Sequence, residues 1–200
     1  MTVHYQDESG HQLQDDVTAL SGASTNTPYD TEEHRKTTIV TSDGKTYRLV
    51  DSQLPSNEKG KVIEGTTQVT YVYKEVLGNV TVHYQDESGH QLQDDVTALS
   101  GASTNTPYDT EEHRKTTIVT SDGKTYRLVD SQLPSNEKGK VIEGTTQVTY
   151  VYKEVLGNVT VHYQDESGHQ LQDDVTALSG ASTNTPYDTE EHRKNDDSHF

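Results

Sequence analysis

The stretch TTQVTYVYKE, residues 66–75, carries the strongest strand signal in the chain. Every second residue, Val69, Tyr71 and Tyr73, is apolar or aromatic, and Thr, Val and Lys stand between them. An alternation of this kind is typical of a β-strand with one face buried in a core. β-branched and aromatic residues also fit the pleated surface of a sheet well. We therefore expect a long strand here, with Tyr71 and Tyr73 in the core.

Shorter segments before this stretch predict further strands. Val3 and Tyr5 alternate in the opening residues 2–5, and residues 17–20 fit a short strand. Residues 37–41 and 46–50 flank an Asp-Gly pair, which is the strongest short signal for a β-hairpin. The segments at residues 23–28 and 54–65 are expected to be mostly loop.

One short helix is expected between the strands. Asp30 is placed to cap its start, with Glu33 three residues later as in a capping box. His34, Arg35 and Lys36 then put positive charge at the far end, where it suits the helix dipole. The unit is thus predicted to be mainly β, an α+β arrangement with one helix of one or two turns.

The whole unit is repeated without a single change. Residues 2–80 recur letter for letter as residues 81–159, and a third copy follows from Thr160 to Lys194. We refer to these as the first, second and third copies. The predicted domains are residues 1–77, 78–156 and a truncated 157–194, followed by a tail at 195–200. No Pro- or Ser-rich spacer separates the copies, so they are expected to abut closely.

The tail NDDSHF, residues 195–200, replaces the TTIVTSD that the other copies have at this point. One base inserted after the lysine codon explains it. The codons AAA ACG ACG ATA GTC ACT TCT GAT become AAA AAC GAC GAT AGT CAC TTC TGA, which encode the observed tail and a stop. We hypothesise that the tail is a frameshift product, which sequencing the gene would test. The third copy, which lacks its hairpin and closing strand, is expected to be loosely ordered or to borrow contacts.

Composition excludes several classes of protein. The chain has no Cys, so it cannot form disulfides or thiolate metal sites. Its net charge of −17 disfavours nucleic acids and anionic membranes as partners. No apolar run approaches the roughly 18 residues that indicate a membrane-spanning helix. We expect a monomer that does not insert into membranes. Any export signal and anchor of a secreted parent would lie outside this sequence.

Candidate catalytic and metal-binding residues are weak. His4, His11 and His34 recur in every copy, but their spacing is irregular and no Cys supports a zinc site. The acidic pairs Asp7-Glu8 and Asp15-Asp16 lack the spacing of a calcium-binding EF-hand loop. No pairing of a nucleophile with a base stands out. We therefore predict no catalytic residue, no metal, no cofactor and no enzyme activity.

Tyrosine rings are the candidates for ligand contact, because an exposed ring can stack on a sugar. Tyr5 and Tyr29, with their second-copy equivalents Tyr84 and Tyr108, are the less clearly buried tyrosines in the sequence. The alternative for each is a place in the core, where tyrosine contributes a large apolar area and a polar tip. Sequence leaves both alternatives open.

The motifs at the two ends of the unit resemble a known family. VTVHYQDESG at residues 80–89 and QVTYVYKEV at residues 68–76 resemble MucBP-type repeats of Gram-positive surface proteins. PYDT at 28–31, DGKTYRLV at 43–50 and GKVIEG at 60–65 are similar to the streptococcal high-identity tandem repeats called SHIRT domains.

This resemblance implies small β-grasp or ubiquitin-like domains in tandem, with one short helix each, arranged as an elongated rod. It also implies a non-enzymatic stalk in an adhesin anchored to the cell wall, where the repeats project a binding head. An alternative is a module that binds mucin or glycans through many weak sites. A third hypothesis is an accessory region of a wall-associated enzyme.

Overall fold

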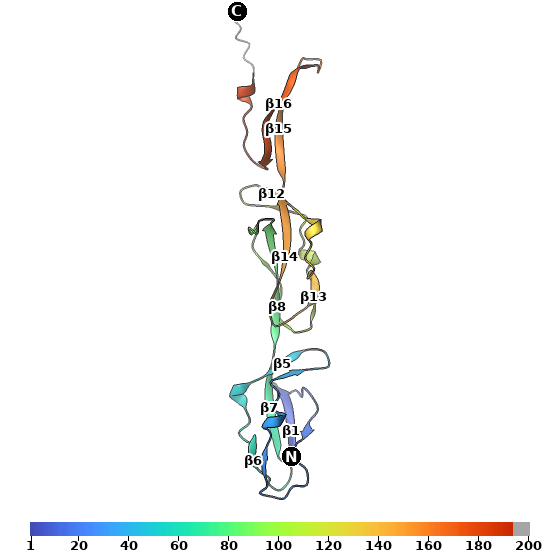
Figure 1. Cartoon of the computed structure of the whole chain (residues 1–200), viewed down its shortest axis with the longest axis vertical. Coiled ribbons are helices and arrows are strands. Elements are labelled where there is room, and N and C mark those ends of the chain that lie inside the picture. The colour runs from blue at the N-terminus through green and yellow to red at the C-terminus, as the bar shows by residue number, and fades with distance from the viewer. Residues whose placement is uncertain (194–200) are drawn as a thin grey trace, which may run out of the picture. The chain divides into compact units, whose positions relative to one another are not determined.

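The computed structural model describes residues 1–193. In Figure 1 the chain can be followed by colour, from blue at the N-terminus to red at the C-terminus. Lys194 and the predicted frameshift tail, residues 195–200, lie outside the described residues. The chain divides into two compact units. The first combines Met1–Thr81, Thr97–Asp109 and Lys138–Gln147, and the second combines Val82–Val96, Thr110–Glu137 and Val148–Phe200. Each unit therefore contains parts of more than one copy.

The first copy forms a five-stranded sheet in the order β2-β1-β7-β5-β4. Its strands are β1 (Thr2–Asp7), β2 (Val17–Thr18), β4 (Thr38–Val40), β5 (Thr46–Leu49) and β7 (Gln68–Glu75). The opening strand β1 lies parallel to the closing strand β7, with Val3 opposite Val69 and Tyr5 opposite Tyr71. The two ends of the repeat thus meet in the centre of its sheet, and both alternating patterns turn the same face to the core.

A second, two-stranded ladder pairs β3 (Pro28–Asp30) with β6 (Lys59–Lys61). Strand β6 lies in the segment 54–65, which was expected to be mostly loop, and β3 runs from the end of the other expected loop, Pro28, to the predicted helix cap, Asp30. Two single turns of 3-10 helix, η1 (Glu32–His34) and η2 (Asp51–Gln53), complete the first copy.

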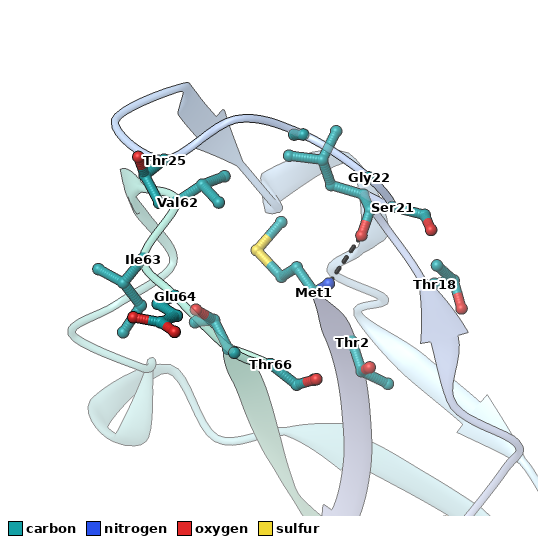
Figure 2. Close-up of a pocket in the computed structure, with 14 residues that line it drawn as sticks. Met1, Thr2, Thr18, Ser21, Gly22, Thr25, Val62, Ile63, Glu64 and Thr66 are labelled. Carbon is teal, nitrogen blue, oxygen red and sulfur yellow. Dashed lines mark hydrogen bonds between the residues drawn. The ribbon is translucent and has the colours of Figure 1, made fainter.

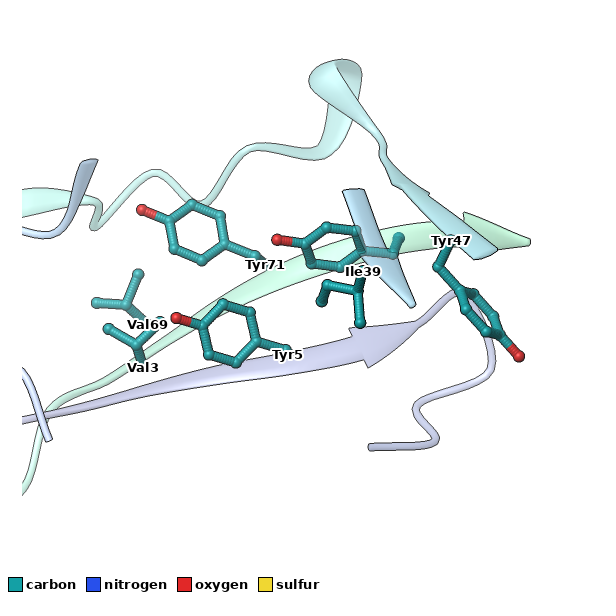
Figure 3. Packing of buried hydrophobic residues seen from close by; sticks show 7 residues of the cluster. Val3, Tyr5, Ile39, Tyr47, Val69 and Tyr71 are labelled. Atoms are coloured by element: carbon teal, nitrogen blue, oxygen red, sulfur yellow. The ribbon is translucent and has the colours of Figure 1, made fainter. Parts of the chain in front are cut away.

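The core of the first copy is built on tyrosine. Seven buried residues form it, and Figure 3 shows their packing: Val3, Tyr5, Ile39, Tyr47, Val69, Tyr71 and Tyr73. The rings of Tyr5 and Tyr71 stack with their centroids 6.2 Å apart. The predicted core positions of Tyr71 and Tyr73, both 0% exposed, are confirmed.

The second copy repeats this arrangement in the order β11-β12-β14-β8-β9. Its strands are β8 (Leu77–Asp86), β9 (Val96–Ser103), β11 (Thr117–Val119), β12 (Thr125–Leu128) and β14 (Gly144–Glu154). A ladder of β10 (Pro107–Asp109) with β13 (Lys138–Lys140) and two 3-10 turns, η3 (Glu111–His113) and η4 (Asp130–Gln132), complete it. Tyr84 and Tyr150 stack at 6.3 Å, as their first-copy equivalents do.

The third copy forms a two-stranded antiparallel ladder between β15 (Leu156–Gln164) and β16 (Gln170–Ser182), followed by a 3-10 turn, η5 (Glu190–His192). The register shifts at four places along this ladder. Val161 and Tyr163 are only half-buried, whereas the equivalent Val82 and Tyr84 are enclosed. Up to residue 193, the third copy contains no counterpart of the closing strand that covers those residues in the other copies.

The predicted β-grasp or ubiquitin-like fold with one short helix in each unit is wrong. The described chain is mainly β, with curled sheets, and its only helical segments are 3-10 turns of three residues. At the expected helix, the amides of His34 and Arg35 bond to the carbonyls three residues back. Arg35 then takes an extended conformation, with φ −72° and ψ 110°. The β-branched residues after it continue as strand, so the segment is too short to repay the cost of an α-helical nucleus.

Candidate functional sites: the tyrosine faces and the repeat junction

Two of the four candidate ligand-contact tyrosines are enclosed. Tyr5 and Tyr84 are each 1% exposed, and their hydroxyls donate to the backbone carbonyls of His34 and His113 at 3.0 and 2.9 Å. Lys36 places its ammonium 5.6 Å from the centroid of the Tyr5 ring. Neither ring offers a free face on which a sugar could stack.

The other two candidates, Tyr29 and Tyr108, are half-buried and lie on the small ladders. The Tyr29 ring crosses Gly60 of the neighbouring strand, where an added Cβ would stand 2.9 Å from the hydroxyl oxygen. That hydroxyl donates to the carbonyl of Asn57 at 3.1 Å. Glycine thus leaves room for the ring on its strand, and the part of the ring still open to solvent is the candidate stacking surface.

The histidines pair with carboxylates one at a time. His4 Nδ1 lies 2.6 Å from Asp16, and His11 Nδ1 lies 3.0 Å from Asp7. Burial opposes ionisation of Asp7, but hydrogen bonds from the amides of Ser9 and His11 and from the His11 ring outweigh it and lower the pKa of Asp7. These contacts close a turn. Within residues 1–193, no group of three or more His, Asp or Glu side chains is arranged to hold a metal ion.

No helix in the described residues has the length and apolar character needed to cross a membrane.

The junction between the first and second copies lies within the first unit. It includes Gly78 of residues 76–79, which we call the connecting segment. A Cβ added at Gly78 would overlap the carbonyl oxygen of Ile142 and stand 2.8 Å from Cγ1 of Val141. Val141 is 1% exposed, whereas the equivalent Val62 of the first copy is only half-buried. The connecting segment therefore packs directly on the second copy, and only glycine fits at this point.

The Asp-Gly hairpin of the first copy forms the other side of this junction. Asn105, in the left-handed conformation at φ 67°, donates from its side chain to the carbonyl of Asp43 at 2.9 Å. The amide of Thr46 donates to the hydroxyl of Thr104 at 2.8 Å. Gly44 lies directly under the Asn105 side chain, so an added Cβ would overlap it. The hairpin that was predicted from sequence thus also holds the next copy.

An ion pair closes the edge of the junction. Arg48 donates to both carboxylate oxygens of Glu143, at 2.8 Å each. Hydrogen bonding and charge from each partner raise the pKa of Arg48 and lower the pKa of Glu143. Both side chains are more than half exposed, so solvent screens the pair and its contribution to stability is small.

The hairpin contacts recur between the second and third copies, within the second unit, but the glycine contact does not, because a Cβ added at Gly157 would meet no atom within 4 Å. The amide of Thr125 donates to Thr183 Oγ1 at 2.6 Å, and Asn184 donates to the carbonyl of Asp122 at 3.2 Å. Sequence reasoning expected the copies to abut but did not identify the residues involved. Gly78 was the available signal, because an isolated glycine in a strand-like segment often marks a close approach of another backbone.

The model of the MucBP domain matches residues 1–74, 79–153 and 158–196, one match for each copy. The chain belongs to the MucBP domain family. This confirms the resemblance carried by the motifs at the two ends of the unit. The MucBP repeats of this chain follow one another with only a few residues between successive matches.

Curated relatives of this MucBP chain include much longer proteins. It is 34% identical over 178 residues to Muramidase-released protein of Streptococcus suis, covering 78% of this chain and 14% of that protein. It is 31% identical over 187 residues to Internalin J of Listeria monocytogenes, covering 90% of this chain and 19% of that protein. The chain thus spans less than a fifth of the length of either relative.

Among solved structures, the chain is similar to SHIRT domains 3-4 from a streptococcal cell surface protein, at 12% identity. The match covers 77% of this chain and 98% of that chain, with a TM-score of 0.28. A TM-score this low supports no conclusion about fold or function.

Proposed function

We propose that this chain is a non-enzymatic repeat region of a bacterial cell-surface adhesin and acts as an extended spacer that projects a binding head. The family membership and the relatives found in streptococci and Listeria support a surface location. The observation that carries the spacer role is the junction itself. Its contacts use the backbone of the Asp-Gly hairpin and a glycine that admits no side chain. The hairpin contact recurs at the next junction.

The physical argument concerns stiffness between copies. A flexible linker lets neighbouring domains reorient freely. Here residues 77–79 of the connecting segment belong to strand β8, and Gly78 packs against Val141 and Ile142, so bending would require these contacts to break. A copy joined in this way adds a defined increment of length, and copy number then sets reach.

The spacer function is tested by counting copies. The chain is compared with forms that carry one and two additional units upstream, and the maximum dimension is measured by small-angle X-ray scattering. A ten-residue strand spans roughly 33 Å, so we expect a constant increase of about that size for each added unit. A maximum dimension that levels off as units are added would contradict the proposal.

A second candidate function is weak, multivalent binding to mucin or glycans. The half-buried Tyr29 and Tyr108 favour this multivalent function, because equivalent rings on successive copies would offer the same stacking surface to a repeated sugar. The intact chain is titrated onto immobilised mucin and a glycan array, beside a Tyr29→Ala/Tyr108→Ala double variant. Saturable binding that the double variant loses would support this function. If the intact chain shows no saturable binding, the glycan-binding function is rejected and the spacer function remains.

A further inference from the structure

The strand at one edge of each five-stranded sheet has open backbone groups. In the first copy this strand is β4, which pairs with β5 and lies at the end of the sheet order. The carbonyl of Thr37 and the amide of Thr41 bond toward the β5 side of the hairpin, at 3.0 and 2.9 Å. Bonding alternates along an antiparallel pair, so Thr38 and Val40 turn their amides and carbonyls outward. No strand of the described chain pairs with them there.

The side chains of this edge do not protect it. Residues 37–41 read Thr-Thr-Ile-Val-Thr, with no charge, no proline and no glycine. Ile39 anchors the strand in the core, as Figure 3 shows, while Val40 is 65% exposed on the other face. The equivalent Val119 on β11 is also 65% exposed. Natural sheets usually protect an edge with charges, proline or a bulge, because open backbone groups are a template for pairing with another strand.

The opposite edge of the same sheet is protected by charge. There β2 pairs with β1, and Figure 2 shows Thr18 of β2 and Thr2 of β1, which are opposite each other in this pair. Asp15 and Asp16 come directly before β2, and the equivalent β9 follows the same two aspartates. Adjacent carboxylates at the start of an edge strand oppose pairing with another strand. The contrast identifies β4, and its equivalent β11, as the open edges.

The charges on the two sides of β4 complement each other when the strand is reversed. Glu33 and Lys45 lie equally far from Ile39, on its two sides. Arg35 and Asp43 also lie equally far from it, closer to the strand. Two β4 strands that pair antiparallel about Ile39 therefore bring opposite charges together at each end. Complementary charges of this kind fix register and orientation more than they add affinity.

A shift of the pairing in either direction loses this complementarity. Pairing Thr38 with Thr38 would bring Glu33 to Asp43, two acidic residues. Pairing Val40 with Val40 would instead bring two basic residues together. Like charges that face each other across strands are destabilising. The register about Ile39, in which Thr38 of one strand faces Val40 of the other, is thus the favoured one.

We propose that β4 and its equivalent β11 are docking sites for the same edge strand of a second copy of this chain. The two strands pair antiparallel about Ile39 or the equivalent Ile118, and the two sheets continue into one. The strand is short and each chain has a net charge of −17, so the contact is weak and association grows with concentration. The proposal goes beyond the spacer function, because it concerns contacts between chains.

Disulfide trapping tests the register, because the chain contains no cysteine. One form of the full chain carries Thr38→Cys and Thr117→Cys, and the other carries Val40→Cys and Val119→Cys. In the proposed pair, Cα atoms directly opposite each other lie about 5.5 Å apart, within disulfide range, whereas identical positions lie more than about 7 Å apart. In an equimolar mixture under mild oxidation, mixed dimers should therefore outnumber either dimer of identical chains by about tenfold.

Blocking the edge is a second test, which needs no cysteine. Sedimentation velocity follows the unchanged chain over a rising concentration series, beside a form with Val40→Lys and Val119→Lys. Both valines are exposed, so the fold is retained, and a charge on each edge should abolish association. The matched control is Ile63→Lys with Ile142→Lys, which adds the same charge at side chains 63% and 62% exposed and outside the strands. The control should associate like the unchanged chain.

Three results would overturn the docking proposal. The first is an unchanged chain that stays monomeric at every concentration, and the second is equal association of the edge variant and its control. The third is trapping of mixed dimers and dimers of identical chains in the proportions of random collision. None of these results would affect the spacer function, because the increase in length for each added unit is a property of a single chain.

Discussion

At the scale of the residue, tyrosine gives this small unit its core. Tyr71 is fully buried, and its hydroxyl lies 3.0 Å from the carbonyl oxygen of Thr31 and 2.9 Å from Glu58 Oε1, the two acceptors available to its single proton. Burial, reinforced by the Glu58 carboxylate, raises the pKa of Tyr71 to about 12, and burial raises the pKa of Tyr73 to about 12. These rings supply apolar area in a chain that is only 28% hydrophobic, while their hydroxyls satisfy loop carbonyls.

The raised pKa values predict an alkaline transition. In the unfolded chain tyrosine ionises near 10.0, and in the folded chain Tyr71 and Tyr73 ionise near 12. The stability they confer is therefore complete below pH 10 and is lost as pH rises toward 12. Tyrosinate absorbance and circular dichroism should change together over this range. Full ionisation of every tyrosine near pH 10 with the fold intact would contradict this.

A Tyr71→Phe variant isolates the hydroxyl from the ring. It removes the buried hydroxyl that the Thr31 carbonyl and the Glu58 carboxylate share, and because a hydrogen bond to a charged group is among the stronger ones we expect a loss of about 1–3 kcal/mol at neutral pH. The matched control is Tyr29→Phe, whose hydroxyl bond to Asn57 is exposed and should cost much less. Chemical denaturation of both variants measures the difference, and equal losses would mean that the buried hydroxyl has no special role.

At the scale of the element, the connecting segment of strand β8 has two roles. It begins β8, which lies between β14 and β9 in the sheet of the second copy, and it packs against Val141. Gly78 is buried for this reason, whereas the equivalent Gly157 is exposed, and a Cβ added there would meet no atom within 4 Å. The two glycines stand in the same local sequence, Leu-Gly-Asn, and differ only in what lies against them.

This difference predicts opposite outcomes for one substitution. Gly78→Ala forces a methyl group against the Ile142 carbonyl and should lower the free energy of unfolding by about 1–3 kcal/mol. Gly157→Ala meets open space and should stay within about 0.5 kcal/mol of the parent. Urea titration followed by circular dichroism measures both, and equal effects of the two substitutions would show that the close approach does not exist.

At the scale of the whole molecule, one repeated sequence occupies three different surroundings. Val62 of the first copy is half-buried, its equivalent Val141 in the second copy is 1% exposed, and the described part of the third copy holds no counterpart of the closing strand. Tyr84 is 1% exposed under β14, and the equivalent Tyr163 is half-buried, although both hydroxyls still donate to a histidine carbonyl.

The third copy should therefore contribute little to stability. Tyr84→Ala removes a ring from a complete core and should cost about 3–5 kcal/mol. Tyr163→Ala removes the same ring from an incomplete one and should have a much smaller effect. Chemical denaturation of the two variants and the parent measures the contrast, and a Tyr163→Ala loss as large as that of Tyr84→Ala would mean that the third copy has a core of its own.

Local signals predicted the parts of the fold that depend on neighbours in sequence. The alternation around Tyr71 predicted β7, and the Asp-Gly pair predicted the hairpin of β4 and β5. The ladder of β3 with β6 was missed because its partners lie far apart in sequence and one of them reads Lys-Gly-Lys. The helix was predicted wrongly, because capping residues start a turn but do not supply the length that an α-helix needs.

The sequence by itself determined the repeat, its family, its strand pattern and its tyrosine core, because these follow from residue types and their spacing. Only the tertiary structure decided which identical residues are covered. Val62 and Val141, or Gly78 and Gly157, cannot be told apart by their own sequence, since burial is a property of what packs against a residue. The junction depends on contacts between copies, and these exist only where one copy is seated on the next.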